Sequence, residues 1–316
     1  MNTKRAIVPL AILTLTATLA HAQSNKTIMV QHDEGTTKAP VQPKRVIVLD
    51  EESLELALAL GFDIIGLGSG RLAPTDVSGT RINFEALKQG FLARRDLTGV
   101  TYTGNWTAPN LETILALKPE LILRSTWNGN TGYDKLSAIA PTLSFNQNKP
   151  DFWKTSLRET AKVFGQQDKA EQIIQNVALE HQKNKDKLQQ AGIFKKYPKA
   201  VVLSPFPSGE VYLYTGDRVA NIAWELGFKD GYPRGTKVDP GGWQVISQEA
   251  LLQITPDTLV INVPWGDGNA FSKSSVGQRL KDRTITYQME PFSPWTGPLV
   301  DQKVSRDLTS SILKQF

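Results

Sequence analysis

A short segment that occurs twice constrains the fold of this chain most. The sequence NLETILALKPELIL at residues 110–123 returns as SQEALLQITPDTLV at residues 247–260, which aligns Glu112 with Glu249. Each copy begins with a residue type that caps helices, continues up to a proline, and then passes into an apolar strand. Few identities survive between the copies, so the repeat rests on order and spacing. It predicts two related lobes.

Strands and helices alternate in both halves of the chain. Short β-branched runs without polar alternation are typical of strands that helices cover on both faces. Such runs are found at residues 45–49, 64–67, 121–123, 142–145, 200–203, 210–214, 258–260 and 285–288. Helical patterns lie between them, and the last begins near Lys303. The alternation predicts an α/β fold, with a mostly parallel sheet flanked by helices in each lobe.

The middle of the chain predicts one long helix. Residues 169–190 contain neither glycine nor proline, and strand patterns are absent from the sequence just before them. We therefore expect this helix to join the lobes. The predicted division is an N-terminal lobe at residues 27–165, a linking helix at residues 166–192, and a C-terminal lobe at residues 199–316.

The N-terminus has the features of an export signal. Lys4 and Arg5 precede an apolar run, and the sequence AHA at residues 20–22 has the small-x-small form that signal peptidase accepts. The run is shorter than the roughly 20 residues that span a bilayer. We expect residues 1–22 to be a signal peptide that is removed. Because the chain contains no cysteine, we also expect a protein that is free in the periplasm and is not a lipoprotein.

Charge and histidine content disfavour two classes of partner. The chain has 36 basic and 31 acidic residues without long runs of either sign, which is too balanced to indicate nucleic-acid binding. A site for a bare zinc or manganese ion draws on several histidines with carboxylates. Only His32 and His181 follow the export signal, and they lie far apart in the sequence. We therefore predict no metal-ligating residues.

The chain lacks the common signatures of an enzyme. It has no G-x-S-x-G elbow, and the two histidines that follow the export signal are poorly placed to serve a serine nucleophile. The sequence GLGSGR at residues 66–71 begins like a dinucleotide loop, but Arg71 stands where the third glycine is needed. The carboxylates at residues 50–52 are interpreted as a helix cap. We predict that the protein is not an enzyme, and an exported hydrolase stays as a less favoured alternative.

Several short motifs, spread over nearly the whole chain, carry a family resemblance. They are PKRVIVL at residues 43–49, ALALG at 57–61, PNLE at 109–112, KPEL at 118–121, IAPT at 139–142 and ISQE at 246–249. Together they resemble the periplasmic substrate-binding proteins of bacterial iron-siderophore ABC importers, a family that also contains cobalamin and haem binders. The resemblance implies two α/β lobes joined by one long helix, with the ligand in the cleft between them.

The resemblance also implies the function and the partners. The protein would capture a ferric siderophore, of the ferric dicitrate or hydroxamate type, and deliver it to an inner-membrane ABC permease. It would need no cofactor of its own, because the siderophore already holds the iron, and we expect a monomer. Cobalamin and haem remain open as alternative ligands. The sequence does not identify the chelate or the permease.

The two aligned glutamates have an implied role in docking. In the resembled family, an acidic residue at the position of Glu112 in one lobe and of Glu249 in the other docks against arginines of the permease. Exposed carboxylates that accept bidentate arginine suit a fast and reversible contact. The alternative is that a glutamate in the first turn only complements the helix dipole, worth roughly 0.3 to 1 kcal/mol.

Candidate ligand-binding residues follow the strands, because ligands of open α/β sheets bind beyond the carboxyl ends of the strands. A ferric chelate needs cationic donors for its oxygens and flat apolar walls. Arginine, tryptophan and tyrosine at such positions are Arg71, Trp106, Arg124, Trp127, Tyr214, Arg218, Trp243, Trp265 and Trp295. We expect the ligand to contact a subset of these side chains.

Overall fold

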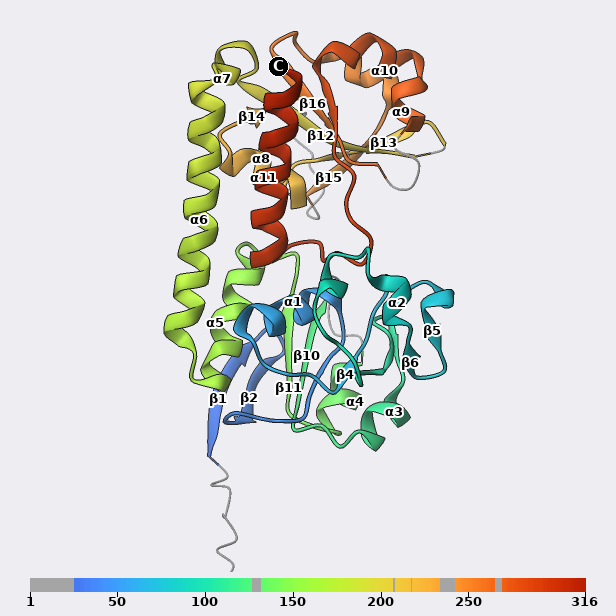
Figure 1. Ribbon diagram of the computed structural model, residues 1–316, viewed down its shortest axis with the longest axis vertical. Coiled ribbons are helices and arrows are strands. Elements are labelled where there is room, and N and C mark those ends of the chain that lie inside the picture. The colour runs from blue at the N-terminus through green and yellow to red at the C-terminus, as the bar shows by residue number, and fades with distance from the viewer. Residues whose placement is uncertain (1–25, 127–131, 207, 217, 234–241, 265–268) are drawn as a thin grey trace, which may run out of the picture.

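The computed structural model describes residues 26–126, 132–206, 208–216, 218–233, 242–264 and 269–316. Two lobes lie one above the other along the long axis, and helix α6 (Gln167–Gln190) runs beside both (Figure 1). The predicted signal peptide at residues 1–22 lies outside the described residues. Within the described part of the chain, no helix combines the length and the hydrophobicity that crossing a membrane requires.

The N-terminal lobe contains a seven-stranded sheet in the order β11-β10-β3-β4-β7-β6-β5. The first five strands of this order are parallel, and β6 and β5 are antiparallel to their neighbours. The strands are β3 (Val46–Val48), β4 (Gly66–Leu67), β5 (Val77–Ser78), β6 (Arg81–Ile82), β7 (Thr101–Tyr102), β10 (Leu121–Thr126) and β11 (Thr142–Asn146). Two hairpins stand apart, formed by β1 (Thr27–His32) with β2 (Gly35–Pro40), and by β8 (Gly104–Asn105) with β9 (Ala108–Pro109).

Helices cover both faces of this sheet, which explains its continuous apolar strands. In β3, Val46 and Val48 enter one core cluster while Ile47 enters another on the opposite face. The helices of the lobe are α1 (Glu51–Leu60), α2 (Phe84–Leu87), α3 (Leu111–Ala116), α4 (Tyr133–Ser137) and α5 (Phe152–Phe164), with 3-10 turns η1 (Pro74–Asp76) and η2 (Leu92–Arg94). Strands buried on both faces favour apolar residues at successive positions, as in β3 and in the first half of β10.

The C-terminal lobe contains a sheet in the order β15-β13-β12-β16-β17, with β14 also paired to β12. Its strands are β12 (Lys199–Pro205), β13 (Glu210–Tyr214), β14 (Lys229–Asp230), β15 (Trp243–Ser247), β16 (Thr258–Asn262) and β17 (Thr284–Thr286). Strands β14, β16 and β17 run parallel to β12, whereas β13 is antiparallel to both β12 and β15. The sheet is more mixed than expected, because the short connection from β12 to β13 can only return the chain antiparallel.

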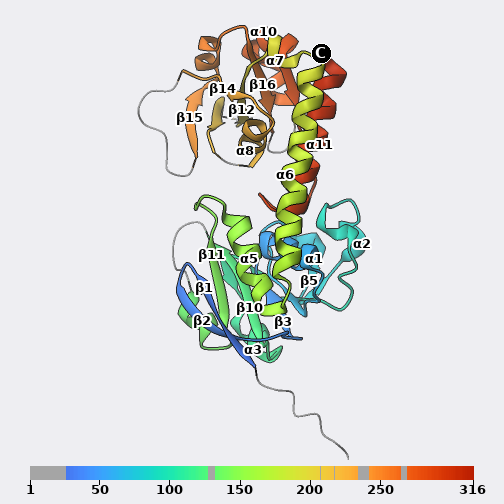
Figure 2. The same ribbon diagram turned by 90° about the vertical axis from the view of Figure 1, so that its left-hand side faces the viewer.

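The remaining elements cover this second sheet. They are α7 (Ile193–Lys196), α8 (Arg218–Glu225), α9 (Asn269–Lys273), α10 (Ser275–Leu280) and α11 (Pro298–Gln315), with 3-10 turns η3 (Gln248–Gln253) and η4 (Lys281–Arg283). Helix α11 begins at Pro298 rather than near Lys303, because proline suits the first turn of a helix. Helices α6 and α11 lie side by side (Figure 2).

The sequence repeat occupies equivalent positions in the two sheets. The strand that ends the first copy, β10, lies between β3 and β11, and the strand that ends the second copy, β16, lies between β12 and β17. The predicted capping residues act as caps: Asn110 accepts a hydrogen bond from the Thr113 amide (3.0 Å), and Ser247 accepts one from the Ala250 amide (3.4 Å). The second copy forms a 3-10 helix rather than the expected α-helix.

A second connection between the lobes accompanies helix α6. After β17 the chain descends to the N-terminal lobe and returns as α11 (Figure 1). Phe292 is buried in the core of the N-terminal lobe, and the Phe91 amide donates a hydrogen bond to the Pro291 carbonyl (3.0 Å). We retain the division at residues 27–165, 166–192 and 199–316 as a proposal, supported by the position of each sheet within one range.

Candidate functional site at the junction of the lobes

Helix α1 begins at the carboxyl end of β3 with a run of buried carboxylates. Asp50, Glu51, Glu52 and Glu55 are each at most 3% exposed, and we call them the interlobe carboxylate cluster. Asp50 is the N-cap of α1, since its Oδ1 accepts the Ser53 amide (2.7 Å). Its Oδ2 accepts the amide of Ser125 in β10 (2.6 Å). The cap predicted for residues 50–52 is therefore present at Asp50, but the glutamates have other partners.

Two of these glutamates bind the backbone that follows the C-terminal sheet. Glu52 Oε1 accepts the Trp295 amide (2.7 Å). Glu55 Oε1 accepts the amides of Leu299 (2.5 Å) and Val300 (2.7 Å). These last two amides belong to the first turn of α11, where backbone N–H groups have no partner within the helix and carry partial positive charge. The carboxylates thus hold the start of α11 against α1.

Burial shifts the protonation of the cluster towards the neutral form. Desolvation raises the pKa of Glu52 to about 7, although the nearby Arg71 charge opposes the shift. Desolvation also raises the pKa of Glu55 well above its ordinary value, and that of Asp301 in α11 to about 7. Among the described residues, no hydrogen bond reaches Glu55 Oε2. A proton on the Glu55 carboxyl removes the cost of an unpaired buried charge.

Arg71 lies where the lobes meet. Its Nε is 3.7 Å from Glu51 Oε2, and its Nη2 is 3.6 Å from Glu52 Oε1. Its guanidinium lies over the indole of Trp295, 4.8 Å from the ring centroid. The Ser69 hydroxyl donates to Glu51 and so fixes that carboxylate. Ion pairing and stacking therefore orient Arg71, while 21% of its side chain stays exposed.

Trp106 joins the same neighbourhood from the N-terminal lobe. It lies in the turn between β8 and β9, partly buried. A Cβ atom added at Gly70 would lie 1.4 Å from Trp106 Nε1, so the indole covers this glycine next to Arg71. The structure thus brings together three predicted ligand residues, Arg71, Trp106 and Trp295, around the turn that follows β4.

The other predicted ligand residues lie elsewhere. Arg124 was expected in a loop, but β10 continues to Thr126 because its last residues pair with β11; Arg124 is therefore buried within the strand and 6% exposed. Tyr214 ends β13 and is also 6% exposed, and Trp243, opposite it in β15, packs against Tyr212 (centroids 4.7 Å apart). The Arg218 side chain, Trp127 and Trp265 lie outside what the structure describes.

The repeat aligns two pairs of acidic residues, Glu120 with Asp257 and Glu112 with Glu249, and the two pairs differ in their surroundings. Glu120 accepts the amides of Lys44 (2.6 Å) and Arg45 (3.1 Å), and Asp257 contacts Lys199 Nζ (3.1 Å). Both therefore bind the residues at the start of the neighbouring strand. Glu112 and Glu249 lie exposed in the first turns of α3 and η3, and within the described residues neither has a hydrogen bond or ion pair.

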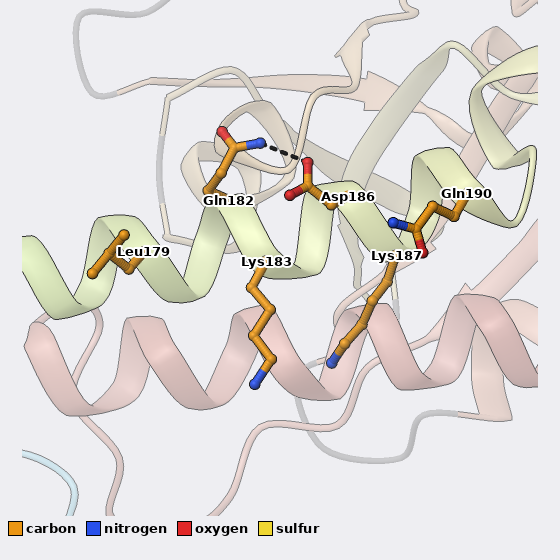
Figure 3. A pocket seen from close by; sticks show the side chains of 6 residues that line it. All are labelled: Leu179, Gln182, Lys183, Asp186, Lys187 and Gln190. Atoms are coloured by element: carbon orange, nitrogen blue, oxygen red, sulfur yellow. Dashed lines mark hydrogen bonds between the residues drawn. The ribbon is translucent and has the colours of Figure 1, made fainter.

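Two cavities are formed by described residues, and neither contains the Arg71 guanidinium or the docking glutamates. A groove of about 420 Å³ follows α6 beside α11 and is lined by Leu179, Gln182, Lys183, Asp186, Lys187 and Gln190 (Figure 3). A second, of about 370 Å³, is lined by residues of α1, η2 and α11 and two flanking positions. Neither is lined by a predicted ligand residue. Among the described residues, no group of three or more His, Asp or Glu is placed to hold a metal ion.

Sequence reasoning missed the interlobe role of Glu51, Glu52 and Glu55. Acidic residues in a first helical turn are usually exposed and need no partner beyond the helix dipole. One signal was present: Leu54, Leu56 and Ala57 lie on different sides of α1, which indicates burial all around the helix. Glutamates inside such a helix require buried partners.

Three curated relatives illustrate what the chain is similar to. It is 33% identical over 213 residues to the probable siderophore-binding lipoprotein YfiY of Bacillus subtilis (strain 168), with 66% of this chain and 59% of the relative covered. Two others from that organism are the Fe(3+)-citrate-binding protein YfmC (25% identical; 78% and 71% covered) and the iron(3+)-hydroxamate-binding protein FhuD (26% identical; 92% and 87% covered). The chain thus spans less than two thirds of YfiY.

Solved structures share the fold. Staphylococcus aureus SirA complexed with staphyloferrin B has a TM-score of 0.69 at 23% identity, covering 90% of this chain and 98% of SirA. FhuD from Vibrio cholerae, bound to Fe³⁺-Desferal, has a TM-score of 0.68 at 22% identity, covering 85% and 98%. The predicted α/β fold with two lobes is thereby confirmed.

The relatives correct one prediction. YfiY and a further relative, YhfQ (30% identical; 54% of this chain and 52% of the relative covered), are both named as lipoproteins. By comparison with these two relatives, the expectation that the protein is not a lipoprotein is wrong. It had rested on the absence of cysteine from the chain.

The family itself is shown by a sequence profile. The profile described as periplasmic binding protein matches residues 46–283, which run from the first strand of the N-terminal sheet to the end of η4. The match includes both copies of the repeat and the segment that joins them. With fold, motifs and profile in agreement, this chain belongs to the periplasmic binding protein family.

Proposed function

We propose that this protein captures a ferric siderophore between its lobes and delivers it to the permease of an ABC importer. The observation that carries the proposal is Arg71, held at the junction of the lobes between two glutamates and the Trp295 ring. Relatives named for siderophore, ferric citrate and ferric hydroxamate binding support this class of ligand. The iron is cargo inside the ligand, so the protein supplies no metal ligands and no catalysis.

The chemistry of the junction suits an anionic chelate. The guanidinium of Arg71 can donate to chelate oxygens with the part of its surface that remains exposed, while Trp106 and Trp295 provide flat apolar walls. The negative charge of Glu51 and Glu52 opposes an anion. With a pKa of about 7, however, Glu52 takes up a proton as the anion arrives, which removes part of the repulsion.

Tryptophan fluorescence during titration tests the ligand class. Ferric citrate, ferric desferrioxamine, ferric enterobactin, haem and cobalamin are each added to the purified protein. We expect saturable quenching by at least one ferric siderophore, and an affinity at least about tenfold lower for Arg71→Ala, as for loss of a charged hydrogen bond. Arg158→Ala is the matched control, since Arg158 pairs with Glu171 on an exposed helical surface.

The outcomes separate the alternatives. Quenching by haem or cobalamin alone would keep the binding role and replace the ligand. Quenching by no compound below the micromolar range would reject the proposal. An unchanged chelate affinity in Arg71→Ala would show that the ligand binds elsewhere than at the junction around Arg71. Turnover of a bound compound would support the hydrolase alternative instead.

The permease contact is proposed for Glu112 and Glu249. Both are exposed, and both precede a central strand of their lobe. Within the described part of the chain, neither has a hydrogen bond or ion pair, whereas Glu120 and Asp257 bind the neighbouring strand. A monomer with one glutamate on each lobe can contact two symmetric halves of a permease at once. Arginine is the partner that fits an exposed carboxylate with both oxygens available.

Charge reversal distinguishes docking from helix capping. We expect Glu112→Arg and Glu249→Arg to lower iron uptake in cells while the chelate affinity of the purified protein stays unchanged. Asp168→Arg is the control, because Asp168 is likewise an exposed acidic residue in the first turn of a helix. Equal loss of uptake in all three variants would favour an effect on the helix dipole over docking.

A further inference from the structure

An exposed leucine accompanies each docking glutamate. Among the described residues, the large apolar side chains that are exposed are Met29, Val41, Leu115, Leu179, Val245, Leu252 and Leu313. Two of these, Leu115 (61% exposed) and Leu252 (41% exposed), are aligned with each other in the sequence repeat. Each follows its glutamate by three residues. Single exposed leucines need no explanation, but a pair at equivalent positions in two lobes does.

The helices cannot turn these leucines inward. Ile114 and Leu251, the residues just before them, are fully buried and fix the inner face of each short helix. Residues three positions apart lie on the same side of an α-helix and are nearly eclipsed in a 3-10 helix. Glu112 with Leu115 on α3, and Glu249 with Leu252 on η3, therefore form one outward face each. We call these two faces the Glu-Leu pairs.

The combination points to a protein partner with a mixed surface. A carboxylate alone serves long-range attraction, whereas an apolar side chain beside it contributes only when it is covered in the complex. The residues that follow the glutamate and the leucine differ between the copies: they are Thr113 and Ala116 in one, and Ala250 and Gln253 in the other. Glutamate and leucine are thus retained together on the outer face while their neighbours vary.

We propose that the two Glu-Leu pairs form a bipartite docking surface for the importer's permease, in which Leu115 and Leu252 each fill an apolar pocket beside an arginine. This inference rests on the proposed delivery function and adds the leucines to the contact. The carboxylates steer and orient the encounter, and burial of the leucines slows dissociation. Placement in both lobes favours a partner with two equivalent halves over a flat lipid surface or a second copy of this chain.

Iron uptake in cells tests the leucines separately from the glutamates. Cells that lack their own copy of this protein receive the wild type, Leu115→Ser, Leu252→Ser, the double variant, or Leu179→Ser. Leu179 is the matched control, because it is 66% exposed on α6, outside the repeat. Radioactive iron is supplied as ferric citrate and as ferric desferrioxamine, and the chelate affinity and melting temperature of each purified variant are measured alongside.

We expect each single change to lower the uptake rate, and the double change to lower it by at least about fivefold, as for loss of a central contact residue. Chelate affinity and melting temperature stay at wild-type values, and Leu179→Ser behaves as wild type. Normal uptake by the double variant, while Glu112→Arg is impaired, would overturn the role of the leucines and leave glutamate docking intact. Normal uptake by both would reject docking itself.

Two further outcomes would also overturn the inference. If light scattering finds a wild-type dimer that the double variant loses, the leucines cover each other in a second copy of this chain. If the wild type binds anionic lipid vesicles and the double variant does not, the pairs face a membrane surface. Failure of the proposed function itself can be distinguished from these outcomes. In that case no chelate quenches the tryptophan fluorescence of the wild type.

Discussion

Glu52 is a buried ionisable residue that also forms a contact between the lobes. It is 3% exposed, it accepts the Trp295 amide, and its second partner is the guanidinium of Arg71. Burial raises its pKa from an ordinary 4.5 to about 7. The folded protein therefore binds a proton at Glu52 more tightly than the unfolded chain does. Its contribution to stability is full below about pH 4.5 and is lost as pH rises through about 7.

Glu52→Gln should remove this pH dependence. The amide keeps an oxygen for the Trp295 amide and carries no charge at any pH. Between about pH 5.5 and about pH 8 the wild type should lose on the order of 1 to 2 kcal/mol of unfolding free energy more than Glu52→Gln does. Urea unfolding across this range checks the difference. Parallel curves for the two proteins would mean that Glu52 is ionised throughout.

Gly70 is expected to be essential for the position of Trp106. A methyl group at residue 70 would collide with the indole, since its Cβ would lie 1.4 Å from Nε1 and 2.0 Å from Cε2. Gly70→Ala should therefore displace Trp106 and lower chelate affinity by at least about tenfold, if the indole forms a wall of the site. Gly216→Ala is the control, because its nearest neighbour lies 3.8 Å from the added Cβ. Unchanged affinity would remove Trp106 from the site.

At the scale of elements, the two ends of the repeated segment pack within their lobe, whereas the outer face of its short helix is exposed. Its acidic residue after the proline, Glu120 or Asp257, binds the start of the adjacent strand and positions β10 or β16 in the sheet. Its capping residue starts the helix. The outer helical face is then free for contact with a partner. The same local sequence therefore serves packing at its ends, and its middle carries the docking face that we propose.

Removal of the caps should destabilise the two lobes unequally. Asn110→Ala loses a 3.0 Å hydrogen bond at the start of an α-helix, whereas Ser247→Ala loses a weaker one of 3.4 Å at a 3-10 helix. We expect a loss of about 1 kcal/mol for the first and about half that for the second. Urea unfolding measures both, with Thr107→Ala as a surface control. A larger loss for Ser247→Ala would contradict this ranking.

At the scale of the whole molecule, the lobes are joined by more than the long helix. The segment before α11 inserts Phe292 into the N-terminal core, and α11 starts on the Glu55 carboxyl. Helix α6 alone would allow bending at its ends. The second connection opposes such bending, because any opening of the junction must break buried hydrogen bonds and expose the cluster to water.

Gly297→Ala should loosen this junction. The added Cβ would lie 1.9 Å from Glu55 Oε2, a buried atom on a side chain that backbone amides hold in place. We expect a loss of roughly 2 to 4 kcal/mol in unfolding free energy and faster amide exchange at the start of α11. Hydrogen exchange by mass spectrometry locates the effect. Uniform loss of protection in both lobes would contradict a local opening at the junction.

The sequence by itself determined the elements whose causes are local. The caps at Asn110 and Ser247, the long Gly-free and Pro-free helix, and the apolar strands were all predictable, because hydrogen-bond partners and hydrophobic patterns within a few residues specify them. Two lobes and the family resemblance followed from the repeat and the motifs. Exposure was also expected for Glu112 and Glu249, because acidic residues in a first helical turn are usually exposed, but the same rule fails for Glu51 and Glu52.

Only the tertiary structure decided which side chains meet across the lobes. Arg71 was predicted as a ligand residue, but its contact with the Trp295 ring joins residues more than 200 positions apart in the sequence. Arg124 was placed in a loop because strand pairing with β11, which extends β10 by three residues, has no local signal. Burial, and with it the protonation of the interlobe cluster, depends on what covers a residue, and distant segments provide that cover.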